Sequence, residues 1–121
     1  MVLKMEHEIK IVRNAEERKK EIKAISDQIT RGIVIPNKRT LIVTPDLFAK
    51  IFSPKRIELL MLLAIKNDYN ITELAKKLKR PFEVVHRDLK LFEFYGFVRM
   101  VKERKSIIPE LAGEIRMPVI S

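Results

Sequence analysis

The chain has 121 residues, 46% of them hydrophobic, which suits one compact domain or a short module fused to another. Lys and Arg number 25 against 16 Asp and Glu, and the formal charge of +9 favours a polyanionic partner, either nucleic acid or an anionic membrane. A membrane span is excluded because the longest apolar run, residues 57–65, contains Glu58 and is far shorter than the roughly 20 residues required. With no Cys and only 2 His, the chain is expected to hold no disulfide, metal or cofactor.

The composition also carries expectations about where the protein works. The first residues alternate charged and apolar side chains and resemble neither a signal peptide nor a transit peptide, so we expect a cytoplasmic protein. Richness in Lys, Glu and Ile without Cys or Trp is typical of a thermophile.

The first elements in the chain predict a strand, a helix and a second strand. Apolar and charged residues alternate over residues 3–11, which predicts a strand whose odd-numbered face is buried. Asn14 and Glu17 have the spacing of a capping box, and Gly32 ends the predicted helix. This helix has an apolar stripe formed by Ala15, Ile22, Ile25 and Ile29. Its basic face, formed by Arg18, Lys19, Lys20 and Lys23, is either solvated or an accessory phosphate contact. The β-prone run 40–43 predicts the second strand.

Two further helices follow, a short one over residues 45–52 and a longer one over residues 54–67. Ser53 and Pro54 are a typical N-cap and first helical residue. The longer helix is apolar around nearly its whole circumference, so both of its sides must be covered. We expect the N-terminal segment or a partner subunit to supply the second cover.

Residues 71–78 and 81–95 predict a pair of helices joined by a tight turn at Lys79 and Arg80. Asn70 and Glu73 form a second capping-box pattern ahead of the first helix. In the second helix one apolar stripe is expected to face inward; it comprises Phe82, Val85, Leu89 and Phe92. A rotation of about 100° per residue places another set outward, namely Arg80, Glu83, Arg87, Lys90 and Phe94.

After Gly96, residues 97–101 and 106–108 predict a hairpin whose charged tip spans residues 102–105, and residues 115–119 predict a C-terminal edge strand. A buried helix, a helix pair and a hairpin are the parts of a winged helix-turn-helix. We therefore predict an α+β fold with an N-terminal strand-helix-strand extension over residues 1–52, the winged helix-turn-helix over residues 53–108, and the edge strand within residues 109–121.

This arrangement predicts a DNA-binding surface. The major groove admits one helix, which must present polar side chains outward, while phosphates follow the turn and the hairpin tip. Residues 54–105 contain 13 Lys and Arg against 7 Asp and Glu, a net charge of +6. The candidate contact residues are Lys76, Lys77, Lys79, Arg80, Glu83, His86, Arg87, Lys90, Lys102, Arg104 and Lys105.

Several stretches also resemble a known family of proteins. The stretches are PKRIELL from Pro54, ELA from Glu73, VHRDLK from Val85 and YGFV from Tyr95. They resemble a group of small archaeal and bacterial winged-helix transcriptional regulators related to the MarR and ArsR repressors. The resemblance extends to the strands outside the motif and implies sequence-specific binding to duplex DNA. The all-round apolar helix and the C-terminal edge strand favour a homodimer over a monomer. The group often has a basic and an amide residue where this chain has Glu83 and Val84; Glu83 either reads a cytosine amino group or repels phosphate.

The same residues admit other interpretations. The sequence from His86 to Lys90 matches the start of a kinase catalytic loop, but Glu93 stands where the metal-binding Asn would be and no glycine-rich loop is present. Asp88 is expected either to pair with Lys55 or Arg56 or to lie at the surface, and His86 to contact phosphate or a base edge or to have a local role.

The aromatic residues from Phe92 to Phe97 fit core and dimer packing better than a platform for single strands. No nucleophile or carboxylate pair indicates an enzyme, and no effector is indicated. The alternative function is a winged-helix protein-interaction module in a toxin-antitoxin, transcription or replication complex. Charge reversal at the hairpin tip separates the two functions.

Overall fold

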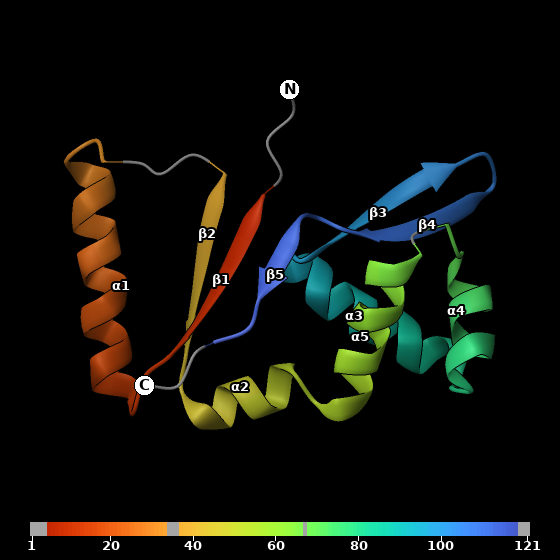
Figure 1. The fold of residues 1–121 in the computed structure, drawn as a ribbon, viewed down its shortest axis with the longest axis horizontal. Coiled ribbons are helices and arrows are strands. Elements are labelled where there is room, and N and C mark those ends of the chain that lie inside the picture. The colour runs from red at the N-terminus through yellow and green to blue at the C-terminus, as the bar shows by residue number, and fades with distance from the viewer. Residues whose placement is uncertain (1–4, 34–36, 67, 119–121) are drawn as a thin grey trace. The chain divides into compact units, whose positions relative to one another are not determined.

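The computed structural model describes residues 5–33, 37–66 and 68–118. The chain forms two compact units (Figure 1). One unit comprises the described residues of the first 51 together with those from Gly113 onward, and the other is Phe52–Ala112. Among the described residues no helix is both long and apolar enough to cross a bilayer.

The first unit is built on a small parallel sheet. Its strands are β1 (Glu6–Ile11), β2 (Lys38–Val43) and β5 (Glu114–Arg116), in the order β2-β1-β5. On β1, His7 and Ile9 are buried, which confirms the expected odd-numbered inner face. β5 lies at an edge, as expected, but ends at Arg116; residue 119 of the predicted strand lies outside the described residues.

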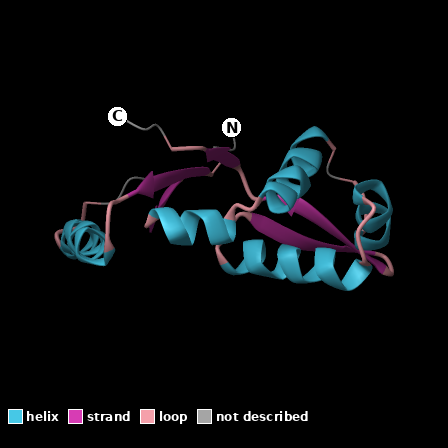
Figure 2. Cartoon of the chain, turned by 90° about the horizontal axis from the view of Figure 1, so that it is seen from below, coloured by secondary structure: helices cyan, strands magenta, loops and turns pink. Residues whose placement is uncertain are grey.

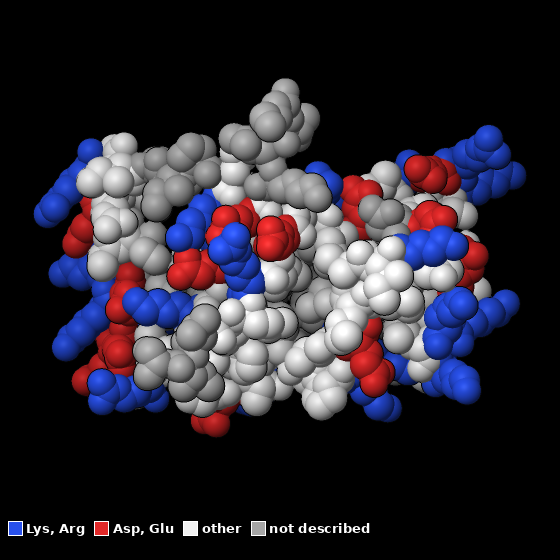
Figure 3. Space-filling model, viewed as in Figure 1, with Lys and Arg blue, Asp and Glu red and all other residues white. Residues whose placement is uncertain are grey.

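The other face of this sheet carries ion pairs. Glu8 pairs with Lys38 at 2.8 Å, Glu6 with Arg116 at 3.1 Å, and Lys10 with Glu21 at 3.0 Å. The hydrogen bond and the charge of Glu8 raise the pKa of Lys38 above its ordinary value. Figure 3 shows acidic and basic side chains intermixed over this sheet. A balanced surface of this kind has no net attraction for a polyanion, so this face is not a candidate for binding nucleic acid.

Two helices complete the first unit: α1 (Ala15–Thr30) and α2 (Pro45–Ile51). The side chain of Asn14 accepts the N–H of Glu17 at 2.9 Å, but Glu17 accepts the N–H of Arg13, so the expected capping box is only half formed. Gly32 follows the helix with φ +81°, as predicted. No described side chain of α1 is buried, and Ile22 and Ile29 are 42% and 60% exposed. The described residues therefore leave the apolar stripe of α1 uncovered at Ile22 and Ile29.

The second unit consists of three helices and a hairpin (Figure 2). The helices are α3 (Pro54–Ile65), α4 (Ile71–Leu78) and α5 (Phe82–Phe94), and the strands are β3 (Val98–Glu103) and β4 (Ser106–Leu111). The ring centroids of Phe52, Phe92 and Phe97 lie 5.7–6.3 Å apart in the core. Packing of Phe92 and Phe97 in the core, which the sequence favoured over a stacking platform, is confirmed.

α3 begins as predicted, with Ser53 accepting the N–H of Arg56 and with Pro54 in the first turn. The expected cover on the second side of α3, by the N-terminal segment or a partner subunit, stays a prediction. Leu59, Leu60 and Leu63 are buried, but Met61 and Ile65 are 60% and 82% exposed. Length and hydrophobicity alone do not specify which side of a helix the remaining elements cover.

The hairpin is longer than predicted. β4 continues through Pro109, which is buried opposite Met100, whereas the sequence placed the end of the strand before this proline. Each strand of a two-stranded sheet has one free edge, so a residue without an N–H is tolerated there. Only Arg104 and Lys105 separate the strands, and Arg104 has a left-handed φ of 54°.

Candidate nucleic-acid interface

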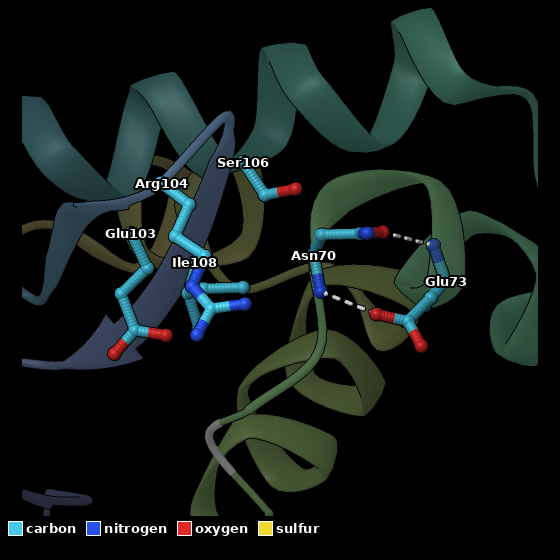
Figure 4. Close-up of a pocket in the computed structure, with 6 residues that line it drawn as sticks. All are labelled: Asn70, Glu73, Glu103, Arg104, Ser106 and Ile108. Carbon is cyan, nitrogen blue, oxygen red and sulfur yellow. Dashed lines mark hydrogen bonds between the residues drawn. The ribbon is translucent and has the colours of Figure 1, made fainter.

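α4 and α5 are joined by a tight turn whose geometry follows from two caps. Asn70 accepts the N–H of Glu73 at 2.8 Å and donates its own N–H to the Glu73 carboxylate at 3.0 Å, so the predicted second capping box is confirmed (Figure 4). α4 ends at Leu78, and its C-cap residue, Lys79, is left-handed with φ 54°. The N–H of Arg80 then returns to the carbonyl of Ala75 at 3.0 Å. The chain thereby reverses within a few residues and α5 begins at Phe82.

α5 has a buried arc and an exposed one. Its buried residues are Val85, Asp88, Leu89 and Phe92. Four of the residues predicted to face outward are exposed, namely Glu83, Arg87, Lys90 and Phe94. At about 100° per residue these four lie opposite the centre of the buried arc. Their predicted outward placement is confirmed.

Arg80 was also expected to point outward, and this placement is wrong. Its Nη2 donates to the Asp88 carboxylate at 2.6 Å, and its side chain is only 9% exposed. Arg56 donates to the other oxygen of Asp88 at 3.0 Å. The expected pairing of Asp88 with Arg56 is therefore confirmed, while Arg80 is a second partner that apolar spacing did not indicate. Because its charge is engaged inside the unit, Arg80 is not part of the exposed cationic set.

Phe82 was expected to face inward, and this placement is also wrong. It is 47% exposed, and its ring stacks on that of His86, with centroids 5.9 Å apart and planes 8° from parallel. Apolar spacing in the sequence assigned only apolar residues to the inner side of α5. Burial of Asp88 moves the centre of the arc away from Phe82, which lies about 70° from it. The missed signal was the carboxylate of Asp88, which lies beside the apolar stripe on the side away from Phe82.

The remaining candidates lie on α4 and at the hairpin tip. Lys76, Lys77 and Lys79 are exposed, and the Nζ of Lys77 lies 6.0 Å from the centroid of the Tyr69 ring. At the tip, all three predicted cations are exposed: Lys102, Arg104 and Lys105. Figure 3 shows basic side chains gathered over the hairpin tip and over α4. Cations from α4, α5 and the hairpin thus belong to one compact unit.

An open pocket of about 540 Å³ lies between the start of α4 and the hairpin (Figure 4). Its lining residues are Asn70, Glu73, Glu103, Arg104, Ser106 and Ile108. Asn70 Oδ1 and Glu73 Oε1 are engaged with each other's backbone in the cap. Within the described part of the chain, no group of three or more His, Cys, Asp or Glu side chains is arranged to hold a metal ion.

Three helices, a tight turn and a following hairpin define a winged helix-turn-helix, and comparison with solved structures confirms this fold. The homodimeric winged helix-turn-helix DNA-binding domain of Mb0332 from Mycobacterium bovis, a possible ArsR-family transcriptional regulator, matches with a TM-score of 0.52 at 18% identity. The match covers 84% of this chain and 77% of that one. Rv0081 from Mycobacterium tuberculosis matches with a TM-score of 0.50 at 21% identity, over 56% of this chain and 69% of that one.

A family model described as HVO_A0114 matches residues 51–114, more than half of the chain, and the chain belongs to that family. None of the curated proteins matches this chain. The resemblance to ArsR-like winged-helix proteins inferred from the sequence is confirmed at the level of the fold.

Proposed function

We propose that this protein is a transcriptional regulator that binds specific sequences in duplex DNA, with α5 in the major groove and the hairpin as a basic wing on the backbone. The observation that carries the proposal is the division of α5 into two arcs. Val85, Leu89 and Phe92 hold the helix to its unit, while Arg87 and Lys90 extend from the opposite side. This is the geometry that a recognition helix requires.

The charges around α5 support the same proposal. Lys90 pairs with Glu93 at 3.2 Å, but both side chains are substantially exposed, at 57% and 39%, so the pair is weak and Lys90 is available to a phosphate. The exposed cations of α4 and of the wing add phosphate contacts on either side of the helix. Glu83, on the same exposed arc, either accepts a hydrogen bond from a cytosine amino group or weakens binding to phosphate.

We further propose a homodimer in the cytoplasm, associated with the nucleoid, in which the extension of residues 1–52 contributes to the dimer contact. The Mb0332 fragment is described as homodimeric. The support within this chain is the uncovered stripe of α1, where Ile22 and Ile29 are exposed. A two-fold dimer would place two α5 helices in successive major grooves. No catalytic step or cofactor is part of the proposal.

The test begins with selection of bound duplexes from a randomised pool, followed by binding titrations of the best duplex over a range of salt. We expect the logarithm of the affinity to fall linearly with the logarithm of the salt concentration, by about 0.9 for each phosphate neutralised. Arg87→Ala should weaken specific binding by about 5- to 150-fold, the cost of losing one bidentate base contact. Arg13→Ala is the matched control, because Arg13 is exposed and belongs to the other unit. A flat salt response would contradict the proposal.

A second candidate function is a protein-interaction module in a toxin-antitoxin, transcription or replication complex. The observation that favours it is apolar exposure in the winged-helix unit itself, at Met61, Ile65 and Phe94. A partner bound through such surface would survive charge reversal of the wing, whereas DNA would be lost. Binding of a partner by the charge-reversed protein, together with no salt-dependent DNA binding by the native one, would favour this second function.

A further inference from the structure

The pair formed by Phe82 and His86 lies in the first turns of α5, where a recognition helix meets base edges. Phe82 is the first residue of α5 and follows Pro81, which makes no side-chain cap. Its phenyl ring is 47% exposed and nearly parallel to the imidazole of His86. Single exposed apolar side chains are common on protein surfaces, so the exposure alone implies no function. The position of this residue is what makes its exposure informative.

The stack gives the phenyl ring a fixed direction. Residues separated by four lie on the same side of a helix, so His86 supports Phe82 from the following turn. An aromatic ring also loses little conformational freedom when it makes a contact, because it has only two side-chain torsions. Phe82 is therefore a supported apolar group in the first turn of α5, between the buried arc and the exposed arc that carries Arg87.

The chemistry of the groove defines what such a group can recognise. In the major groove the four base pairs differ in their hydrogen-bond donors and acceptors, and thymine alone adds a methyl group at C5. An apolar side chain placed among base edges gains from that methyl group and gains nothing from the polar edges of the other bases.

We propose that Phe82 contacts the C5 methyl group of a thymine and gives the protein a preference for thymine at one position of each half-site. His86 is a positioning residue that holds the phenyl ring. This inference rests on the proposed function, since it requires α5 to enter the major groove. It assigns the reading of that base to Phe82 instead of Glu83, whose carboxylate would favour cytosine.

The experiment replaces each thymine of the selected duplex in turn by deoxyuridine, which removes the methyl group and retains base pairing. The native protein should lose about fourfold in affinity at one position per half-site, as expected for burial of a single methyl group. Phe82→Ala should bind the thymine and uracil duplexes equally well at that position. Phe94→Ala is the matched control, because Phe94 is 82% exposed at the other end of α5, and it should keep the native discrimination.

The role of His86 is tested in the same assay. His86→Ala should reduce the discrimination between thymine and uracil, because the phenyl ring loses its support, and His86→Phe should retain it, because a stacking partner remains. If every uracil substitution is neutral, or if Phe82→Ala keeps the discrimination, the inference is overturned while the proposed function stands. If the protein binds no duplex in a salt-dependent way, both the inference and the proposed function are overturned.

Discussion

The carboxylate of Asp88 binds Arg80 at 2.6 Å and is itself only 4% exposed. The other carboxylate oxygen of Asp88 accepts a hydrogen bond of 3.0 Å from Nε of Arg56, which lies on α3. One buried carboxylate therefore joins the residue that precedes α5, the helix α5 itself and the helix on which it packs. The N-terminal half of α5, where the proposed base contacts lie, is held by this ionic cluster as well as by apolar packing.

Removing the negative charge at this cluster should destabilise the winged-helix unit. Asp88→Asn keeps the side-chain volume but leaves Arg56 and Arg80 near each other, with side chains only 24% and 9% exposed. We expect the free energy of unfolding to fall by about 3–5 kcal/mol, the usual cost of removing one partner of a buried ion pair. Urea denaturation followed by circular dichroism measures the change.

The control for this prediction is Glu93→Gln, which removes the exposed pair with Lys90. That substitution should change the free energy of unfolding by at most about 1 kcal/mol. Equal unfolding midpoints for Asp88→Asn and the native protein would show that the cluster contributes no net stability.

Local signals in the sequence were sufficient to place most elements. The capping box at Asn70 and Glu73 and the proline after Ser53 fix where α4 and α3 begin, because each satisfies backbone groups within its own turn. The spacing of Val85, Leu89 and Phe92 likewise identified the inner side of α5.

Residues whose placement depends on distant partners were not predictable in this way. Arg80 is buried because it pairs with Asp88, eight residues away on the next helix. Phe82 is the first residue of α5 and lies at the edge of the buried arc, where it is 47% exposed. Similarly, nothing in the amphipathic pattern of α1 indicates that the described residues leave Ile22 and Ile29 exposed. Tertiary context decided all three cases.

The position of the cations, and not only their number, should decide DNA binding. Reversal of Lys102, Arg104 and Lys105 to Glu changes the net charge by the same amount as reversal of Lys19, Lys20 and Lys23 on α1, and all six side chains are exposed. If the wing lies on the DNA backbone, the first variant should lose most of its affinity for DNA. The slope of the logarithm of its affinity against the logarithm of the salt concentration should become shallower by about 2–3.

The α1 variant should retain most of the native affinity, because its charges act only through the screened long-range field. Fluorescence anisotropy with the selected duplex at several salt concentrations measures both variants. Similar losses in the two variants would indicate nonspecific attraction, or an accessory phosphate contact made by α1, in place of a contact that the wing makes alone.

The junction between β1 and β5 should depend on Gly113. Its φ is +126°, and a Cβ atom there would overlap the carbonyl oxygen of Met5, which accepts the N–H of Glu114 at 2.8 Å. Gly113→Ala should therefore separate β5 from β1, at a cost of about 1–3 kcal/mol for the overlap in addition to the backbone strain. Faster exchange of the Glu114 amide hydrogen, measured by NMR, would report the separation.

Gly32→Ala is the matched control, since Gly32 also has a positive φ, +81°, but among the described residues no atom beyond its chain neighbours lies within 4 Å of an added Cβ. Its cost should be limited to about 1–2 kcal/mol of backbone strain. If the alanine at residue 113 proved no more destabilising than the one at residue 32, the close approach to Met5 would be unimportant.

The uncovered stripe of α1 should control dimerisation if the proposed homodimer forms through the N-terminal extension. Ile22 and Ile29 lie seven residues apart on the same side of α1 and are 42% and 60% exposed. Burying a charge among apolar side chains without a partner is costly, so Ile22→Glu combined with Ile29→Glu should shift the protein toward monomers. Sedimentation equilibrium over a range of concentrations measures the shift in the dissociation constant.

Met61→Glu distinguishes α1 from the other exposed apolar surface, because Met61 is 60% exposed on α3. It should leave the dimer intact if α1 alone supplies the contact. Dissociation by Met61→Glu, with the α1 variant still dimeric, would move the interface to α3. The affinity for a two-half-site duplex should follow the same order, because a monomer has only one α5 to place in the groove and loses the gain from simultaneous contacts.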